Sequence, residues 1–140
     1  MHEFAQRAIK LGQRQPRGAR TINEYINDAI GYRMSPEVVL YYSDHIFGTA
    51  DAIGFRHDVL RVFDLKTGDN PAKMAQLEIY CAIFCLEYNV DPFKIQFDCR
   101  IYQSNEIDKH APTAENIKHI MDKIVAFDQI LDEEWELVLS

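Results

Sequence analysis

Several features that mark common protein classes are absent from this sequence. No stretch approaches the roughly 18 consecutive apolar residues that a membrane-spanning helix needs, and Met1 is not followed by a basic and then apolar leader. We therefore expect a soluble, unexported, cytoplasmic protein with no membrane partner. A Gly-x-x-x-x-Gly-Lys-Ser/Thr phosphate loop is also missing, since "DLKTG" does not fit that pattern, which argues against an ATP-driven motor.

Cysteine is scarce, and its spacing suits no common site. The three cysteines, Cys81, Cys85 and Cys99, lie in hydrophobic surroundings and form no CxxC pair. An odd count of this kind does not suggest a disulfide framework. It supplies neither the paired spacings of a zinc site nor the four thiolates of an iron–sulfur cluster. We expect three small buried hydrophobic side chains.

Acidic residues dominate overall but are missing from one segment. The net charge is −7, which argues against general coating of nucleic acid. Between Phe4 and Arg20, however, there is no acidic residue, and the basic residues of the loop after the first helix are Arg14, Arg17 and Arg20. These three arginines could hold the phosphates of DNA. A solvated charged loop is the alternative, and composition does not decide between them.

The hydrophobic pattern predicts one domain, residues 1–140, of the α/β class. Apolar residues at helical spacing predict helices over residues 2–11, from a cap at Thr21 or Asn23, over 72–88, and after a cap at Thr113. Runs rich in β-branched and aromatic residues predict strands at 37–43, 46–55, 59–66 and 92–102. The first three strands should form an antiparallel meander. The expected architecture is a mixed β-sheet flanked by helices.

Two aspartates and a lysine stand at the ends of neighbouring predicted strands. In "VFDLKTG" the strand period of two places Asp64 and Lys66 on one face, opposite Phe63 and Leu65. Asp51, in "GTAD", lies on the preceding strand. Two carboxylates and a backbone carbonyl form the all-oxygen site that Mg²⁺ or Mn²⁺ prefers. The alternative is an exposed cross-strand pair with a turn aspartate.

Three short motifs in this region resemble the PD-(D/E)XK nuclease superfamily, specifically its RecB-type, phage exonuclease-like branch. They are "GTAD", "DLKTG" and "QLEIY", the last with Gln76 and Tyr80. The resemblance implies an αβββαβ restriction-endonuclease-like core, to which this chain adds a C-terminal helix. It further implies that Asp51, Asp64, the Leu65 carbonyl and His2 ligate the metal, that Lys66 is the catalytic lysine, and that Gln76 and Tyr80 serve both the catalytic centre and the DNA backbone. Glu3 and Glu37 are alternative acids.

The function implied by this resemblance is Mg²⁺- or Mn²⁺-dependent hydrolysis of DNA phosphodiester bonds. We expect an exonuclease-like enzyme acting on linear or single-stranded DNA ends in recombination, repair or DNA processing. If it is encoded by a phage or prophage, its compartment is the bacterial host cytoplasm. A homo-oligomer and a recombination partner protein are plausible associates. The alternative is a catalytically impaired binding or scaffold protein that retains the nuclease fold.

Overall fold

The computed structural model describes residues 1–18, 20–68 and 73–139, with side chains as far as residue 134. The chain begins with two helices, which are α1 (His2–Leu11) and α2 (Thr21–Gly31). Three strands and a helix follow: β1 (Ser35–Ser43), β2 (Ile46–Arg56), β3 (Val59–Leu65) and α3 (Met74–Glu87). After a 3-10 turn at Pro92–Lys94 come β4 (Gln96–Gln103), β5 (Glu106–His110) and the long helix α4 (Ala114–Leu139).

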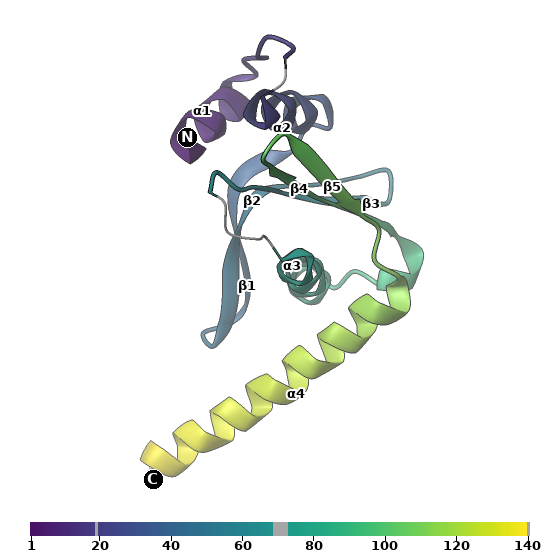
Figure 1. Ribbon diagram of the computed structural model, residues 1–140. Helices are drawn as coiled ribbons and strands as arrows, with labels where there is room; N and C mark the ends of the chain where they lie inside the picture. The colour runs from purple at the N-terminus through teal and green to yellow at the C-terminus, as the bar shows by residue number, and fades with distance from the viewer. Residues whose placement is uncertain (19, 69–72, 140) are drawn as a thin grey trace.

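The strands form one five-stranded mixed sheet in the order β1-β2-β3-β4-β5. Neighbours are antiparallel except β3 and β4, which are parallel because α3 carries the chain from one to the other. The helices α1 and α2 cover one face, whereas β1 and β2 curve around α3 on the other (Figure 1). The predicted α/β class, with a mixed sheet flanked by helices, is therefore confirmed.

Strand alternation divides the buried side chains into two cores. On β3, Leu60 and Val62 face the core formed with α3 and α4, whereas Phe63 and Leu65 face the core formed with α1 and α2. All four side chains are essentially inaccessible to solvent. Burial of each such side chain contributes about 1.5–3 kcal/mol. The third strand is thus fixed from both sides up to its last residue, beside the candidate site.

Helix boundaries follow the predictions with local differences. Thr113 caps α4 as expected, because the Asn116 N–H donates to its hydroxyl oxygen at 3.1 Å. The second helix differs: Thr21 is its first residue, Arg20 takes the N-cap position, and no side chain caps it. The predicted start of α3, Ala72, lies outside the described residues.

A fifth strand, β5, was not predicted. It forms a hairpin with β4 through Ser104 and Asn105, both with positive φ. Its residues are exposed except Ile107, which is half-buried. An edge strand of this kind lacks the hydrophobic alternation on which the prediction depends. The predicted strand 92–102 is also shorter at its start, because Pro92–Lys94 form the 3-10 turn.

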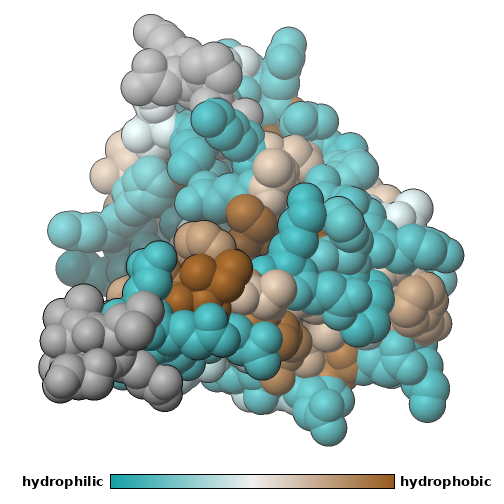
Figure 2. Space-filling model, turned by 90° about the horizontal axis from the view of Figure 1, so that it is seen from below, coloured by the Kyte–Doolittle hydropathy of each residue, from teal (hydrophilic) through white to brown (hydrophobic). Residues whose placement is uncertain are grey.

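The surface has an apolar strip among hydrophilic groups. In the view from below, hydrophobic residues gather in a band bordered by polar ones (Figure 2). Several exposed or half-buried apolar side chains of α3, α4 and the start of β2 also line a shallow pocket, and these include Ile46, Ile79 and Phe127.

In the part of the chain that the structure describes, no helix is both long and apolar enough to cross a membrane.

Candidate functional site

The candidate site lies where β2 separates from β3. The last paired residues of the two strands are Ala52 and Phe63, so Asp51 and Asp64, which would pair next, are not part of the ladder. Instead, the carboxylate Oδ2 of Asp51 accepts a hydrogen bond from the Leu65 N–H at 2.9 Å. A side chain thus replaces the backbone acceptor that the departing strand would have supplied.

The first helix delivers a histidine to the same place. His2 Nε2 lies 2.6 Å from the Leu65 carbonyl oxygen and 3.7 Å from Asp51 Oδ2. Since a carbonyl oxygen only accepts, Nε2 carries the proton and donates it to Leu65. Burial of Ala5 and Ala8 against α2 and the sheet fixes the helix that carries His2. The structure therefore brings His2, Asp51 and the Leu65 carbonyl together, as the resemblance implies.

Asp64 is a buried carboxylate beside a lysine. It is 6% exposed, and its Oδ2 lies 3.2 Å from Lys66 Nζ. That oxygen makes no hydrogen bond, and it is the one buried side-chain oxygen or nitrogen without a hydrogen-bond partner among the described residues. Because an unsatisfied buried carboxylate oxygen costs free energy, this atom is suited to accept an additional cationic partner.

Tyr80 on α3 lies near Asp51 and Asp64, whose charges act on its hydroxyl, and Gln76 contacts Tyr80. The Gln76 amide donates to the Tyr80 hydroxyl at 3.1 Å, as expected for residues four apart on one helical face. A Cβ on Gly48 would lie 2.7 Å from the Tyr80 ring, so any larger residue at that position of β2 requires the ring to shift. The glycine of "GTAD" therefore has a steric role in placing Tyr80.

Mutual repulsion and burial shift the ionisation of this cluster. Burial and, next, the neighbouring Asp64 carboxyl raise the pKa of Asp51, the Leu65 N–H and His2 lower it, and the net value is about 7. Burial also raises the pKa of Tyr80, with Asp64 and Asp51 adding to the effect. Asp51 therefore keeps its proton to a higher pH than an exposed aspartate does, because its charged form lies buried beside Asp64.

Tyr25 is a neighbour of the site that the sequence did not single out. Burial raises its pKa, and the charges of Asp51, Asp64 and Glu37 raise it further. Its position among the buried residues of α2 is typical of a core residue, so the sequence pattern alone gives no sign of a role in the site. Glu37, exposed and with positive φ, lies near enough to influence Tyr25, whereas Glu3 is exposed.

The three arginines of the basic loop do not share one surface. Arg20 lines a pocket with Leu65 and Lys66, beside the carboxylate cluster. Arg14 and Arg17 line a different pocket, which also includes two acidic residues, Glu24 and Asp28. Of the three arginines predicted to contact DNA, Arg20 is therefore the one that shares a pocket with Lys66.

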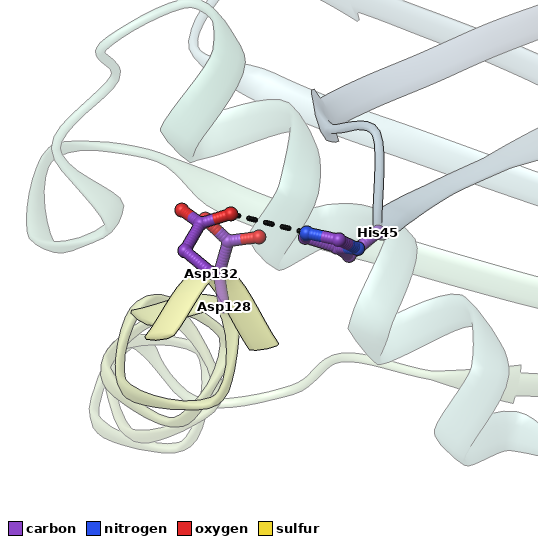
Figure 3. Close-up of side chains that lie close together, drawn as sticks. All are labelled: His45, Asp128 and Asp132. Carbon is purple, nitrogen blue, oxygen red and sulfur yellow. Dashed lines mark hydrogen bonds and ion pairs between the residues drawn. The ribbon is translucent and has the colours of Figure 1, made fainter. Parts of the chain in front are cut away.

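The residues present fit a hard divalent cation such as Mg²⁺ or Mn²⁺. The fit rests on the unsatisfied Asp64 oxygen, the two adjacent carboxylates and the Leu65 carbonyl, since such ions prefer oxygen ligands. The ligand atoms of this site are not gathered tightly, however. A tighter group lies elsewhere in the described ranges: His45, Asp128 and Asp132 each have a donor atom within 4.8 Å of the other two (Figure 3).

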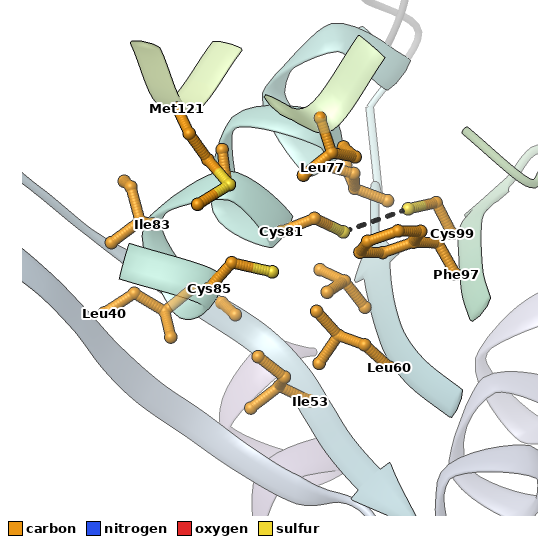
Figure 4. Close-up of a cluster of buried hydrophobic side chains, with 14 of the residues drawn as sticks. Leu40, Ile53, Leu60, Leu77, Cys81, Ile83, Cys85, Phe97, Cys99 and Met121 are labelled. Atoms are coloured by element: carbon orange, nitrogen blue, oxygen red, sulfur yellow. Dashed lines mark hydrogen bonds between the residues drawn. The ribbon is translucent and has the colours of Figure 1, made fainter. Parts of the chain in front are cut away.

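The cysteines are not part of either cluster. Cys81, Cys85 and Cys99 are free and buried in the core between the sheet and α3. The sulfurs of Cys81 and Cys99 lie 3.5 Å apart among apolar side chains (Figure 4). Burial raises the pKa of the Cys85 thiol to about 12, which opposes the thiolate form that metals bind. The prediction that these residues are buried and hydrophobic in role is confirmed.

Comparisons with known proteins give little further information. No protein-family model and no curated protein matches this sequence. Among solved structures, the chain is similar to one titled "Crystal structure of SSO0001", with 10% sequence identity and a TM-score of 0.36, over 89% of this chain and 85% of that one. A likeness at this level assigns neither family nor activity, so the functional reading depends on the geometry of the site.

Proposed function

We propose that this protein is a Mg²⁺- or Mn²⁺-dependent deoxyribonuclease of the PD-(D/E)XK type. One observation carries the proposal. At the point where β2 leaves β3, two carboxylates, a backbone carbonyl and an imidazole meet beside Lys66. The buried Asp64 Oδ2 makes an ion pair with the Lys66 ammonium but no hydrogen bond, which leaves it able to bind a further cation. An exposed cross-strand pair, the simpler alternative, does not account for a 6% exposed Asp64.

Each residue has a role that follows from its position. Asp51, Asp64 and the Leu65 carbonyl would hold the ion, which supplies Lewis-acid polarisation of a phosphate oxygen and a water nucleophile of lowered pKa. His2 would join these ligands only by giving up the Nε2 proton that it donates to the Leu65 carbonyl. The Lys66 ammonium stabilises negative charge that develops on the phosphate in the transition state. Gln76 and Tyr80 offer an amide and a hydroxyl to the DNA backbone on the α3 side of the site.

The proposed substrate is DNA with accessible linear or single-stranded ends. Arg20 supports this because it shares a pocket with Lys66 and can bind a phosphate next to the scissile one. A protomer with a net charge of −7 repels the rest of the duplex, so a homo-oligomer or a recombination partner protein would improve the grip on DNA. An exonuclease of a phage or prophage, acting in the host cytoplasm, is the expected biological setting.

The experiment compares cleavage of linear, circular and single-stranded DNA by wild type, Asp64→Asn and Lys66→Ala in Mg²⁺ or Mn²⁺. We expect Asp64→Asn to lower the rate by at least about a thousandfold, which is about 4 kcal/mol of transition-state stabilisation. Lys66→Ala should cost about 10²–10³-fold. The matched controls are Asp108→Asn and Lys109→Ala, which make the same changes of charge at exposed positions of β5.

The result that contradicts the proposal is absence of cleavage of every DNA form by folded wild-type protein, or equal cleavage by the variants. Calorimetry with Mn²⁺ then identifies which part of the proposal is wrong. Intact Mn²⁺ binding without cleavage would indicate a different reaction. No Mn²⁺ binding would indicate a catalytically impaired binding or scaffold protein.

A further inference from the structure

A second group of metal-ligating side chains lies far from the candidate nuclease site. His45 stands in the tight turn between β1 and β2, and Asp128 and Asp132 lie one turn apart on the same face of α4. The three side chains point toward one another (Figure 3). His45 Nε2 lies 3.0 Å from Asp132 Oδ1, and one donor atom of each residue lies within 4.8 Å of the others.

The charge of Asp128 is not balanced by a basic side chain. This carboxylate is only 9% exposed, and its hydrogen bond comes from the neutral hydroxyl of Ser43, at 2.5 Å. Across the part of the chain that the structure describes, no Lys or Arg is within ion-pair distance of Asp128 or Asp132. Two carboxylates therefore share one imidazole, which leaves a net negative charge where one of them is buried.

The donor types decide which cation fits. One imidazole nitrogen and two carboxylate oxygens suit a borderline divalent metal such as Zn²⁺, whereas Mg²⁺ prefers oxygen ligands alone. The side chains of Tyr41, Asp44, His45 and Asp132 line an open pocket that gives an ion and its waters access from solvent. From this geometry we infer a Zn²⁺-type metal site formed by His45, Asp128 and Asp132.

The position of the site indicates a structural role. Among the side chains of α4 that the structure describes, Ile124 is the last that belongs to the buried core, and the apolar Phe127 and Ile130 beyond it are more than half exposed. The contacts of the β1–β2 turn with Asp128 and Asp132 therefore attach this part of the helix to the sheet. A bound metal would replace those separate hydrogen bonds with one clamp between segments 87 positions apart. The inference does not depend on the proposed nuclease function.

The test is a Zn²⁺ titration of metal-free protein, in wild type and in an Asp51→Asn/Asp64→Asn background that removes the carboxylates of the first site. Calorimetry should show one Zn²⁺ per chain in that background, and saturation should raise Tm by about 5 °C or more. Co²⁺ should give the visible absorption of a protein-bound ion. His45→Ala and Asp132→Asn, both in that background, should each weaken Zn²⁺ binding at least about tenfold, since even loss of an outer-shell partner costs about 10–100-fold.

The controls are His119→Ala and Asp122→Asn, which remove the same kinds of side chain from exposed positions of the same helix. Both should bind Zn²⁺ as their background does. Asp128→Asn is not used, because its burial makes a folding defect the expected result. Folded background protein that takes up no Zn²⁺, or unchanged affinity in both His45→Ala and Asp132→Asn, would overturn the inference and leave a simple ion pair between His45 and Asp132.

Discussion

The two carboxylate clusters of this protein are assembled from very different distances along the chain. In the first, Asp51 binds the amide of Leu65, 14 positions later, and both come from adjacent strands. In the second, His45 meets Asp132, 87 positions later, and the partners come from a turn and a helix. Strand alternation and a short hairpin are enough to predict that Asp51 and Asp64 lie together, although His2 reaches them from 63 positions before Leu65. The second depends on where α4 packs, which no local pattern specifies.

The clusters also differ in how their charge is balanced. Asp64 has the Lys66 ammonium as an ion-pair partner, and Asp51 lies near the Leu65 N–H and His2. Asp128 and Asp132 have only a hydroxyl and an imidazole. In the proposed roles, the ammonium beside the first cluster stabilises negative charge on a substrate next to the bound ion, whereas the second cluster offers metal ligands alone. The following predictions test this contrast.

The largest expected effect is on metal affinity at the first cluster. Asp51→Asn should weaken Mn²⁺ binding by at least about 100-fold. It removes the charge of a proposed direct ligand, and loss of even an outer-shell partner lowers metal affinity by about 10–100-fold. Zn²⁺ binding at the second cluster should be unchanged. Calorimetric titrations with the two ions measure both quantities. Loss of both in a folded variant would show that the clusters are not independent.

Gly48→Ala tests whether the first cluster depends on close packing. The added Cβ would lie 2.7 Å from the Tyr80 ring, and overpacking of this kind costs about 1–3 kcal/mol. We expect a lower Tm and, if Tyr80 serves the substrate, slower cleavage. Gly31→Ala is the matched control because nothing lies within 4 Å of its added Cβ. A Gly48→Ala variant as stable as Gly31→Ala would mean that the Tyr80 ring moves freely.

The raised pKa of Asp51 predicts a specific dependence of stability on pH. Its folded value of about 7 exceeds an unfolded value of about 3.9, so the folded state binds more protons between these limits. Stability must then fall as pH rises through that window, by about 1–2 kcal/mol in the absence of metal. Thermal unfolding of wild type and Asp51→Asn between pH 5 and pH 8 measures the difference. Parallel curves would rule out the raised pKa.

The smallest expected effect concerns the arginines. Arg20→Ala should reduce the salt slope of DNA binding by about one, because each phosphate contact contributes about one unit. Arg14→Ala should leave the slope unchanged, since Arg14 lines the separate pocket with Glu24 and Asp28. Fluorescence anisotropy at several salt concentrations measures both slopes. Equal reductions of the two slopes would show that Arg14 contacts DNA as Arg20 does, and would contradict their assignment to separate pockets.

Local pattern was sufficient for most of the fold. The strands around "FGTADAIGF" and "VLRVFDL" were predicted within one or two residues because β-branched and aromatic side chains alternate between two buried faces. β5 was missed because only Ile107 is partly buried, so an edge strand held by backbone hydrogen bonds leaves no hydrophobic signal. The positive φ of Ser104 and Asn105, which makes its hairpin turn, is weakly encoded in those residue types.

The candidate site was predictable where sequence spacing sets geometry. Asp64 and Lys66 share a face because they are two apart on a strand, and Gln76 and Tyr80 meet because they are four apart on a helix. Tyr25 was missed because a buried tyrosine on an inner helical stripe looks like core. Arg20 lies in a different pocket from Arg14 and Arg17. This separation could not be predicted, because the path of an irregular loop leaves no periodic pattern in the sequence.

The separation of β2 from β3 has a spectroscopic consequence. The Leu65 N–H is bound by a titratable carboxylate, whereas the amides of a regular ladder are bound by carbonyls that never change charge. Its proton resonance should therefore follow the ionisation of Asp51 and any ion that this carboxylate binds. One backbone amide, in a folded protein without added label or substrate, thus provides a direct signal for the chemical state of the site.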